Sequence, residues 1–308
     1  MARDKEKMID MTFLDTEQAF NRGFIHRDYV AHVLRWTHVM KHLKPTQPSK
    51  ILEAGCGVHV PLARTMYTSR HTMHTYLGAD YGPIKPKVEF KGKFQPVFLE
   101  RTDFADVTRS QVKQALGGPA GVVVSFEVLE HVNPDHAVRM IKRMMHLSSK
   151  DVDMFISTPV YDAHVGPASN HVNEWTYDGL RGTFEFLGLY VADHWGTFAS
   201  QSDYKKHLTP EGLAFFDRMS SYYDSNMLAC VMAPMIPPHQ ARNVLWHLRK
   251  GTDETRVNVS PYRYAVKEAD DHLKIGQCTD LEAWARYYQE LGLDQPEWVG
   301  NDDQKVDS

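Results

Sequence analysis

Two glutamates and a histidine stand close together in the middle of the chain, at Glu127, Glu130 and His131. They follow Gly121–Phe126, an apolar run with the pattern of a buried strand. If they form the first helical turn after that strand, the spacing i, i+3 and i+4 puts their side chains on one face. Two carboxylates and an imidazole that converge either repel one another or bind a cation. The segment is therefore a candidate site for metal-assisted or acid–base chemistry.

A second candidate site lies at Ile51–Gly57, where an apolar run leads directly into two glycines. Gly55 and Gly57 let the backbone pass close to a ligand, where a Cβ atom would collide. The helix expected to follow presents free N–H groups at its first turn, which suit a carboxylate. Glu53 adds an acid at the end of the strand. The pattern is typical of a nucleotide-binding turn.

Acidic residues also follow the next two apolar runs. Asp80 ends the second run, and a carboxylate there suits the two donors of a ribose diol. Asp103, followed by Phe104, comes shortly after the third run. Taken singly, each aspartate fits a solvated turn or a helix cap equally well. Their order along the chain is what favours a binding site.

Short apolar runs alternate with helical patterns from residue 50 to about 195, which predicts a doubly wound, mostly parallel α/β sheet. Ligands bind such sheets at the carboxyl edge, where these candidate residues would meet. The predicted strands are Lys50–Glu53, Thr75–Asp80, Pro96–Leu99, Gly121–Phe126, Asp153–Thr158 and Leu189–His194. The predicted helices between them are Val60–Tyr67, Ser110–Leu116, Pro134–Ser148 and Tyr177–Leu187.

The segments on either side of this core are predicted to be helical. Arg27–His42 has apolar residues at helical spacing. We therefore expect an N-terminal arm and helical lid over residues 1–44, a ligand-binding core over 45–200 and a mainly helical C-terminal extension over 201–308. The helices expected in the extension are Leu208–Asp224, His239–Arg249 and Asp280–Leu291. Neither the role of this extension nor the oligomeric state follows from the sequence.

The composition is that of an ordinary globular protein, with 42% hydrophobic and 24% charged residues among 308. A net charge of -4 gives no bulk attraction for nucleic acids or anionic membranes, although a local basic patch remains compatible with it. Three scattered cysteines argue against a disulfide framework or a cysteine-based zinc site. The charged N-terminus and the lack of a long apolar stretch favour a soluble, cytoplasmic protein.

Together these motifs resemble those of the Rossmann-like (class I) methyltransferases. The first motif of that family is acid-x-Gly-x-Gly-x-Gly, which Glu53, Gly55 and Gly57 match, whereas His59 replaces the third glycine. Val124–Val132 closely resembles the fourth-strand motif of the family. A dinucleotide-dependent dehydrogenase would share the glycine turn, but it would not explain the Glu-Val-Leu-Glu-His run.

The resemblance implies S-adenosylmethionine as the cofactor. It implies that Asp80 holds the ribose hydroxyls and that Asp103, with Phe104, contacts the adenine. The implied reaction is direct methyl transfer to an acceptor hydroxyl by in-line displacement. The full set of implied cofactor-binding residues is Glu53, Gly55, Gly57, Asp80, Asp103 and Phe104.

The acceptor side has a narrower resemblance. Glu127–His131 and the later His171–Thr176 resemble the Glu-x-x-Glu-His and His-x-x-Glu-Trp-Thr motifs of the 3′-terminal small-RNA 2′-O-methyltransferases. In that family two acids and two histidines bind a divalent metal that grips the terminal ribose. The implied ligands are Glu127, Glu130, His131 and His171, holding Mg, Mn, Fe or Zn. Ubiquinone-type O-methyltransferases carry similar residues, often with no established metal, and there Thr176 would simply cap a helix.

Three functions stay open. The first is O-methylation of a small molecule or sugar, with Glu127, His131 and His171 as catalytic residues. The second is metal-assisted 2′-O-methylation of an RNA 3′ end. The third is a catalytically silent, methyltransferase-like interaction subunit, suggested by His59 and by the unexplained C-terminal helices. The tetrapeptide typical of DNA amino-group methylation and a Pro-Cys nucleophile are both missing, which disfavours DNA bases as acceptors.

Overall fold

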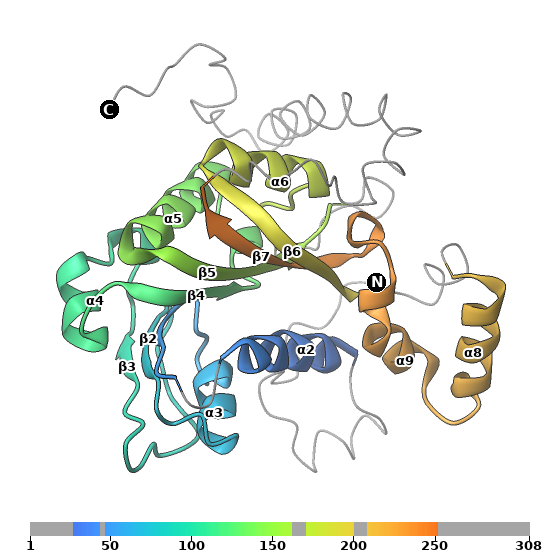
Figure 1. Cartoon of the computed structure of the whole chain (residues 1–308), viewed down its shortest axis with the longest axis horizontal. Coiled ribbons are helices and arrows are strands. Elements are labelled where there is room, and N and C mark those ends of the chain that lie inside the picture. The colour runs from blue at the N-terminus through green and yellow to red at the C-terminus, as the bar shows by residue number, and fades with distance from the viewer. Residues whose placement is uncertain (1–26, 44–46, 162–170, 200–207, 252–308) are drawn as a thin grey trace.

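A computed structural model describes residues 27–43, 47–161, 171–199 and 208–251, and these are built around one seven-stranded sheet (Figure 1). The strand order is β3-β2-β1-β4-β5-β7-β6. All neighbouring strands from β3 to β5 pair in parallel, and β7 runs antiparallel to both β5 and β6. This sheet confirms the predicted fold class. The strands are β1 Lys50–Ala54, β2 Thr75–Ala79, β3 Val97–Leu99, β4 Ala120–Phe126, β5 Ser148–Pro159, β6 Leu189–Phe198 and β7 Asn243–Lys250.

Helices cover both faces of the sheet. Polar side chains cap five of them: in α4, α5, α6, α8 and α9 a side-chain oxygen accepts a hydrogen bond from a backbone N–H in the first turn, and the capping residues are Thr108, Asn133, Thr176, Thr209 and Asp224. None of the helices in the described ranges is long and apolar enough to cross a bilayer. The helices are α2 Arg27–His42, α3 Pro61–Thr68, α4 Arg109–Leu116, α5 Pro134–Leu147, α6 Tyr177–Phe186, α8 Pro210–Ser220 and α9 Ser225–Val231. The short 3₁₀ turns are η2 Phe104–Asp106, η3 Leu129–His131, η4 Ala233–Met235 and η5 Pro238–Gln240.

Two apolar layers cover the sheet, one on each face, and a smaller buried cluster lies around α8 and α9. Successive residues of a strand point to opposite faces, so Val123 of β4 packs with α4, α5 and α6, whereas Val122 and Val124 pack with α2 and α3. Figure 1 shows α5 and α6 on one side of the sheet and α2 and α3 on the other. Burial on both faces explains why the central strands are continuous apolar runs.

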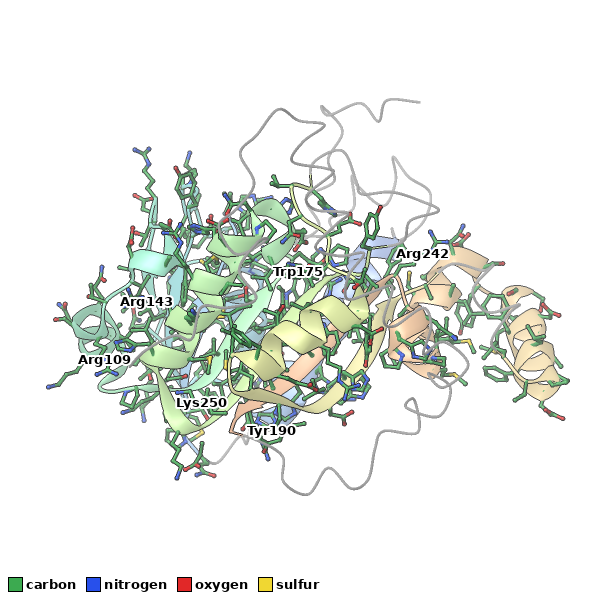
Figure 2. The ribbon with its side chains drawn as sticks, turned by 90° about the horizontal axis from the view of Figure 1, so that it is seen from above. Arg109, Arg143, Trp175, Tyr190, Arg242 and Lys250 are labelled. Carbon is green, nitrogen blue, oxygen red and sulfur yellow. The ribbon has the colours of Figure 1, made fainter. Side chains whose placement is uncertain are left out.

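The predicted strands and helices of the core are confirmed within a few residues, and the helix predicted at Arg27–His42 has those bounds in the structure. The helix predicted at His239–Arg249 is wrong, because Asn243–Lys250 forms β7 between β5 and β6. In Figure 2, Arg242 precedes this strand and Lys250 ends it near Tyr190 of β6. β7 is buried on both faces over its first six residues, and such a run has no strand periodicity to distinguish it from a helix.

Part of the predicted C-terminal extension therefore belongs to the central sheet. The predicted helix Leu208–Asp224 is shorter than expected: α8 ends at Ser220, and Asp224 caps the separate helix α9. The predicted helix Asp280–Leu291 lies outside the described residues. The division of the chain at residue 200 is thus incorrect for the strand β7 and stays a prediction for the rest.

Candidate active site

A cavity of about 780 Å³ opens at the carboxyl ends of β1, β2 and β4. All six predicted cofactor-binding residues line it, as do Glu127 and His131. Helix α2 adds His32 and Trp36, and α5 adds His136. The cavity therefore lies at the sheet edge where ligands bind in doubly wound folds.

The glycine turn after β1 requires glycine at its first position. Gly55 has a φ of +73°, and a Cβ atom there would lie 2.2 Å from Cγ2 of Val128. Gly57 also has a positive φ, of +72°, but a Cβ there would meet only Pro61, at 3.8 Å. Gly55 thus combines a left-handed backbone with a close approach, the two conditions that only glycine satisfies.

His59 stands at the third glycine position of the motif, and the left-handed backbone conformation falls one residue later. The next residue, Val60, takes the left-handed conformation with a φ of 46° and precedes the first turn of α3. The His59 ring bonds through Nδ1 to the carbonyl oxygen of Lys85, at 3.0 Å. The side chain is therefore held beside the turn, and it is not among the residues that line the cavity.

The two aspartates are fixed by backbone donors. Asp80 accepts hydrogen bonds from the backbone N–H groups of Gly57 and Gly82, both at 2.7 Å, which joins the glycine turn to the end of β2. Asp103 caps η2 through the N–H of Ala105, at 2.9 Å. Asp103 therefore serves as a cap and as part of the cavity wall at the same time.

Glu53 forms a buried acid at the end of β1, where it is 2% exposed and accepts a hydrogen bond from the Tyr76 hydroxyl. Burial raises the pKa of Glu53 to about 8, and the nearby Asp80 carboxylate adds to the rise, while the Tyr76 bond opposes it. The acid is mostly neutral at pH 7. A cationic group of a ligand in the cavity would favour its ionised form.

Glu127 does not share a face with Glu130 and His131, so the expected helical turn is wrong at this position. Its φ is 57°, and the helical turn η3 starts only at Leu129. A left-handed glutamate is strained and needs surrounding contacts to hold it. The residues that contact its carboxylate come from three separate elements: Arg35 of α2 at 3.4 Å, Ser157 of β5 at 2.8 Å and Asn243 of β7 at 2.8 and 3.0 Å.

These donors decide the charge of Glu127. Burial alone would raise the pKa of its carboxyl group, but the Arg35 guanidinium and the other donors hold that pKa below its usual value. Arg35 is itself buried, with a side chain 3% exposed. Glu127 is therefore a fixed anion that ties α2, β5 and β7 together beside the cavity.

Glu130, His131 and His171 form a second group, with ligand atoms that all lie within 4.8 Å of one another. The rings of His131 and His171 are 5.2 Å apart. Glu130 is buried and accepts a hydrogen bond from the Thr158 hydroxyl at 3.1 Å. Burial, and then the charge of Glu127, raise the pKa of Glu130 well above its usual value. Three of the four predicted metal ligands thus meet, and Glu127 is directed elsewhere.

Backbone contacts hold the second histidine segment against η3. The N–H groups of Val172 and Asn173 both donate to the carbonyl oxygen of Glu130, at 2.8 and 3.1 Å. Glu174 contacts Nδ1 of His171, and Thr176 caps α6 as one prediction expected. Since these contacts would exist with or without a metal, they do not decide between the two interpretations of the motif.

Several residues that line the cavity or contact its wall at Glu127 had no clear signal in the sequence. Helix α2 contributes His32, Arg35 and Trp36, and packing alone is enough to explain its apolar stripe. His136 lies in the first turn of α5. Asn243 could not be found because its strand was predicted as a helix. A polar residue inside an otherwise apolar helix face, such as Arg35, was the one available hint.

The family model for a methyltransferase domain matches residues 26–208, more than half of the chain, and the chain belongs to that family. It is an S-adenosylmethionine-dependent methyltransferase with a Rossmann-like core. The glycine cradle at Gly55 and the free edge of the Asp103 carboxylate fit such a cofactor. A search of curated proteins returns no match.

Three solved structures with a similar fold each share 15% identity with this chain. One is the 1,6-didemethyltoxoflavin-N1-methyltransferase of Burkholderia thailandensis, with 15% identity and a TM-score of 0.45 over 77% of this chain and 85% of that one. Another is the magnesium protoporphyrin IX methyltransferase of Synechocystis, with 15% identity and a TM-score of 0.42 over 77% and 89%. The small RNA methyltransferase HEN1 has 15% identity and a TM-score of 0.46, and the match covers 75% of this chain but 27% of that one.

Proposed function

We propose that this enzyme transfers the methyl group of S-adenosylmethionine to a hydroxyl oxygen of a small molecule or sugar. The observation that carries the proposal is one continuous cavity, which joins the six cofactor residues to an acceptor end lined by His32, Trp36, Glu127 and His131. Its volume of about 780 Å³ falls within the usual range for pockets that take small ligands.

The roles of the chain's own residues follow from their environments. S-adenosylmethionine supplies the electrophilic methyl group when bound. His131 is exposed in the cavity wall, and we assign it as the base that accepts the proton of the acceptor hydroxyl. Glu127 is a poor base, because its surrounding donors lower its pKa. Its fixed negative charge instead favours a proton donor or a cation at the acceptor end.

A metal-assisted reaction, including 2′-O-methylation of an RNA 3′ end, is the second candidate. It is favoured by the clustering of Glu130, His131 and His171. A divalent ion bound there would lower the pKa of a coordinated hydroxyl group. The mixed oxygen and nitrogen ligands suit Mn, Fe or Zn at least as well as Mg. In this case His131 is a ligand and cannot be the base, so the two candidates make different demands on one residue.

Methyl transfer from labelled S-adenosylmethionine, measured over a panel of hydroxylated small molecules, sugars and RNA 3′ ends, tests both candidates. The panel is run with and without a chelator, and metal content is measured on the same protein. Small-molecule activity that survives chelation supports the first candidate. Activity on RNA ends that falls steeply with salt and is lost on chelation supports the second.

The His171→Ala variant separates the two candidates further. It should abolish a metal-dependent reaction, whereas a metal-free reaction with His131 as base should retain most of its rate. Glu174→Gln is the matched control, because Glu174 contacts His171 without being one of the clustered ligands. Glu174→Gln should therefore weaken a metal-dependent reaction less than His171→Ala does. Cofactor binding with no transfer to any acceptor would instead favour the silent interaction subunit.

A further inference from the structure

Two histidines in the cavity wall are each followed, three residues later, by an arginine that contacts them. On α5, Nη2 of Arg139 lies 2.7 Å from Nδ1 of His136. On α2, Nη1 of Arg35 lies 3.0 Å from Nδ1 of His32. A guanidinium group has only donors, so Nδ1 of each ring must be the acceptor. In the neutral ring the proton then resides on Nε2, which faces away from the arginine.

The Nε2–H group of His136 donates a hydrogen bond to Asp103. Its Nε2 lies 3.1 Å from Oδ1 of Asp103, and the same oxygen accepts the backbone N–H of Ala105 at 2.9 Å. Both protein donors therefore fall on Oδ1. The second oxygen, Oδ2, remains available to a ligand, and Asp103 lines the cavity with a side chain 30% exposed.

We propose that Arg139 and His136 are positioning residues for the cofactor, which hold Asp103 so that Oδ2 accepts a hydrogen bond from the amino group of the adenine. The proposal rests on S-adenosylmethionine as the cofactor and on no particular methyl acceptor. An ionised Asp103 is an acceptor only, so it favours an amino group and disfavours a carbonyl oxygen at the same place. Arg139 fixes the tautomer of the His136 ring, and His136 holds the carboxylate of Asp103 in place. That carboxylate then favours adenine over a nucleobase with a carbonyl oxygen at position 6.

The competing explanation is a structural tie between α5 and the turn η2. Such a tie exists independently, because Nε of Arg143 on α5 donates to the carbonyl oxygen of Ala105 at 2.8 Å. Arg143, labelled in Figure 2, thus bonds to the backbone of Ala105 and not through the His136 ring. Loss of a tie lowers stability, whereas loss of a positioning contact also changes the preference between two bases. Arg143 thus provides a matched control.

The test is calorimetric titration of two probes, S-adenosylhomocysteine and its 6-oxo analogue S-inosylhomocysteine, into the full chain. Wild type should prefer the adenine probe. His136→Ala should weaken the adenine probe about tenfold and reduce the preference by a similar factor, because a charge-assisted hydrogen bond is lost. His136→Gln, which can still donate to Asp103, should restore part of both. Arg143→Gln should lower Tm and leave the preference unchanged.

If the preference for the adenine probe stays within twofold of the wild-type value in both His136→Ala and Arg139→Met, the proposed positioning role is wrong, whatever happens to Tm. Nitrogen NMR adds a readout without ligand: the wild-type His136 ring should show an unprotonated Nδ1, and a protonated Nδ1 contradicts the proposal. Arg139→Met keeps His136 in place, which covers the case that His136→Ala does not fold. If wild type binds neither probe, the cofactor assignment itself fails, a result distinct from a change in preference.

Discussion

The two halves of the cavity are built in different ways. In the cofactor half, backbone N–H groups of the turns hold both aspartates: Gly57 and Gly82 hold Asp80, and Ala105, together with the His136 ring, holds Asp103. In the acceptor half, side chains hold side chains over long sequence separations. Arg35, Glu127 and Asn243 come from three distant parts of the chain, and Asn243 reaches Glu127 because β7 enters the sheet beside β5.

This difference predicts which substitutions should affect each half of the cavity. A backbone-held site depends on a few residues whose conformation or size permits the turn. A side-chain network depends on every charged partner, because removing one leaves the other buried and uncompensated. Substitutions should therefore separate cofactor binding from stability, half by half.

The largest effect is expected at Gly55. In Gly55→Ala the new Cβ would lie 2.2 Å from Val128 Cγ2 in a left-handed backbone, so we expect S-adenosylhomocysteine binding to fall at least about 100-fold. Gly57→Ala is the control, because its Cβ meets only an ordinary contact and should cost about 1–2 kcal/mol in strain. Calorimetry on both variants checks the order. Equal losses would show that the close approach to Val128 is unimportant.

The next effect concerns the acceptor half. Glu127→Ala leaves the buried Arg35 without its carboxylate, so we expect a loss of about 3–5 kcal/mol in the free energy of unfolding. The affinity for S-adenosylhomocysteine should change less than about threefold, because the cofactor half is held separately. The double variant Arg35→Met with Glu127→Ala should recover part of the stability. Urea denaturation measures it, and a double variant no better than the single one would contradict a coupled pair.

A third effect depends on pH. The folded-state pKa of Glu53 is about 8, above its unfolded value, so its stabilising contribution is complete below about pH 4.5 and is lost as pH rises through 8. Relative to Glu53→Gln, wild type should lose stability from pH 5 to pH 8, by at most about 1.4 kcal/mol per unit. Parallel stability curves for the two proteins would mean that Glu53 is not a buried neutral acid.

The smallest effect is expected at His32. It belongs to the acceptor half, so His32→Ala should change the affinity for S-adenosylhomocysteine by less than about twofold. Burial lowers the pKa of His32 to about 4, and the Arg35 charge contributes, so the ring is neutral at pH 7. A large loss of affinity, measured by the same calorimetry, would place His32 at the cofactor and contradict the division of the cavity into two halves.

The residues predicted for the cofactor half all line the cavity, and there is a physical reason for this. The requirements of a glycine turn and of strand-end acids are local, so Gly55, Asp80 and Asp103 appear in order and all line the cavity. The same locality predicted the caps, such as Thr176 at the start of α6. What the sequence did not reveal for Asp103 was its partner His136, which comes from the next helix but one.

The sequence predicted several residues of the acceptor half but not their geometry, because that geometry is decided by tertiary contacts. Glu127 takes a left-handed conformation held by three distant donors, and nothing in the spacing of Glu127 and Glu130 signals it. Asn243 was hidden in a strand buried on both faces, which lacks any distinguishing period. Short-range patterns thus locate the site, and long-range packing decides how half of it works.

The most direct test of the account is calorimetric titration of S-adenosylmethionine and S-adenosylhomocysteine into wild type and Glu127→Ala. We predict one site per chain with micromolar affinity in wild type and nearly the same affinity in the variant, even though the variant is less stable. No heat of binding in wild type at about 1 mM ligand would contradict the methyltransferase assignment. Binding in wild type that disappears in a folded Glu127→Ala protein would contradict the separation of the two halves.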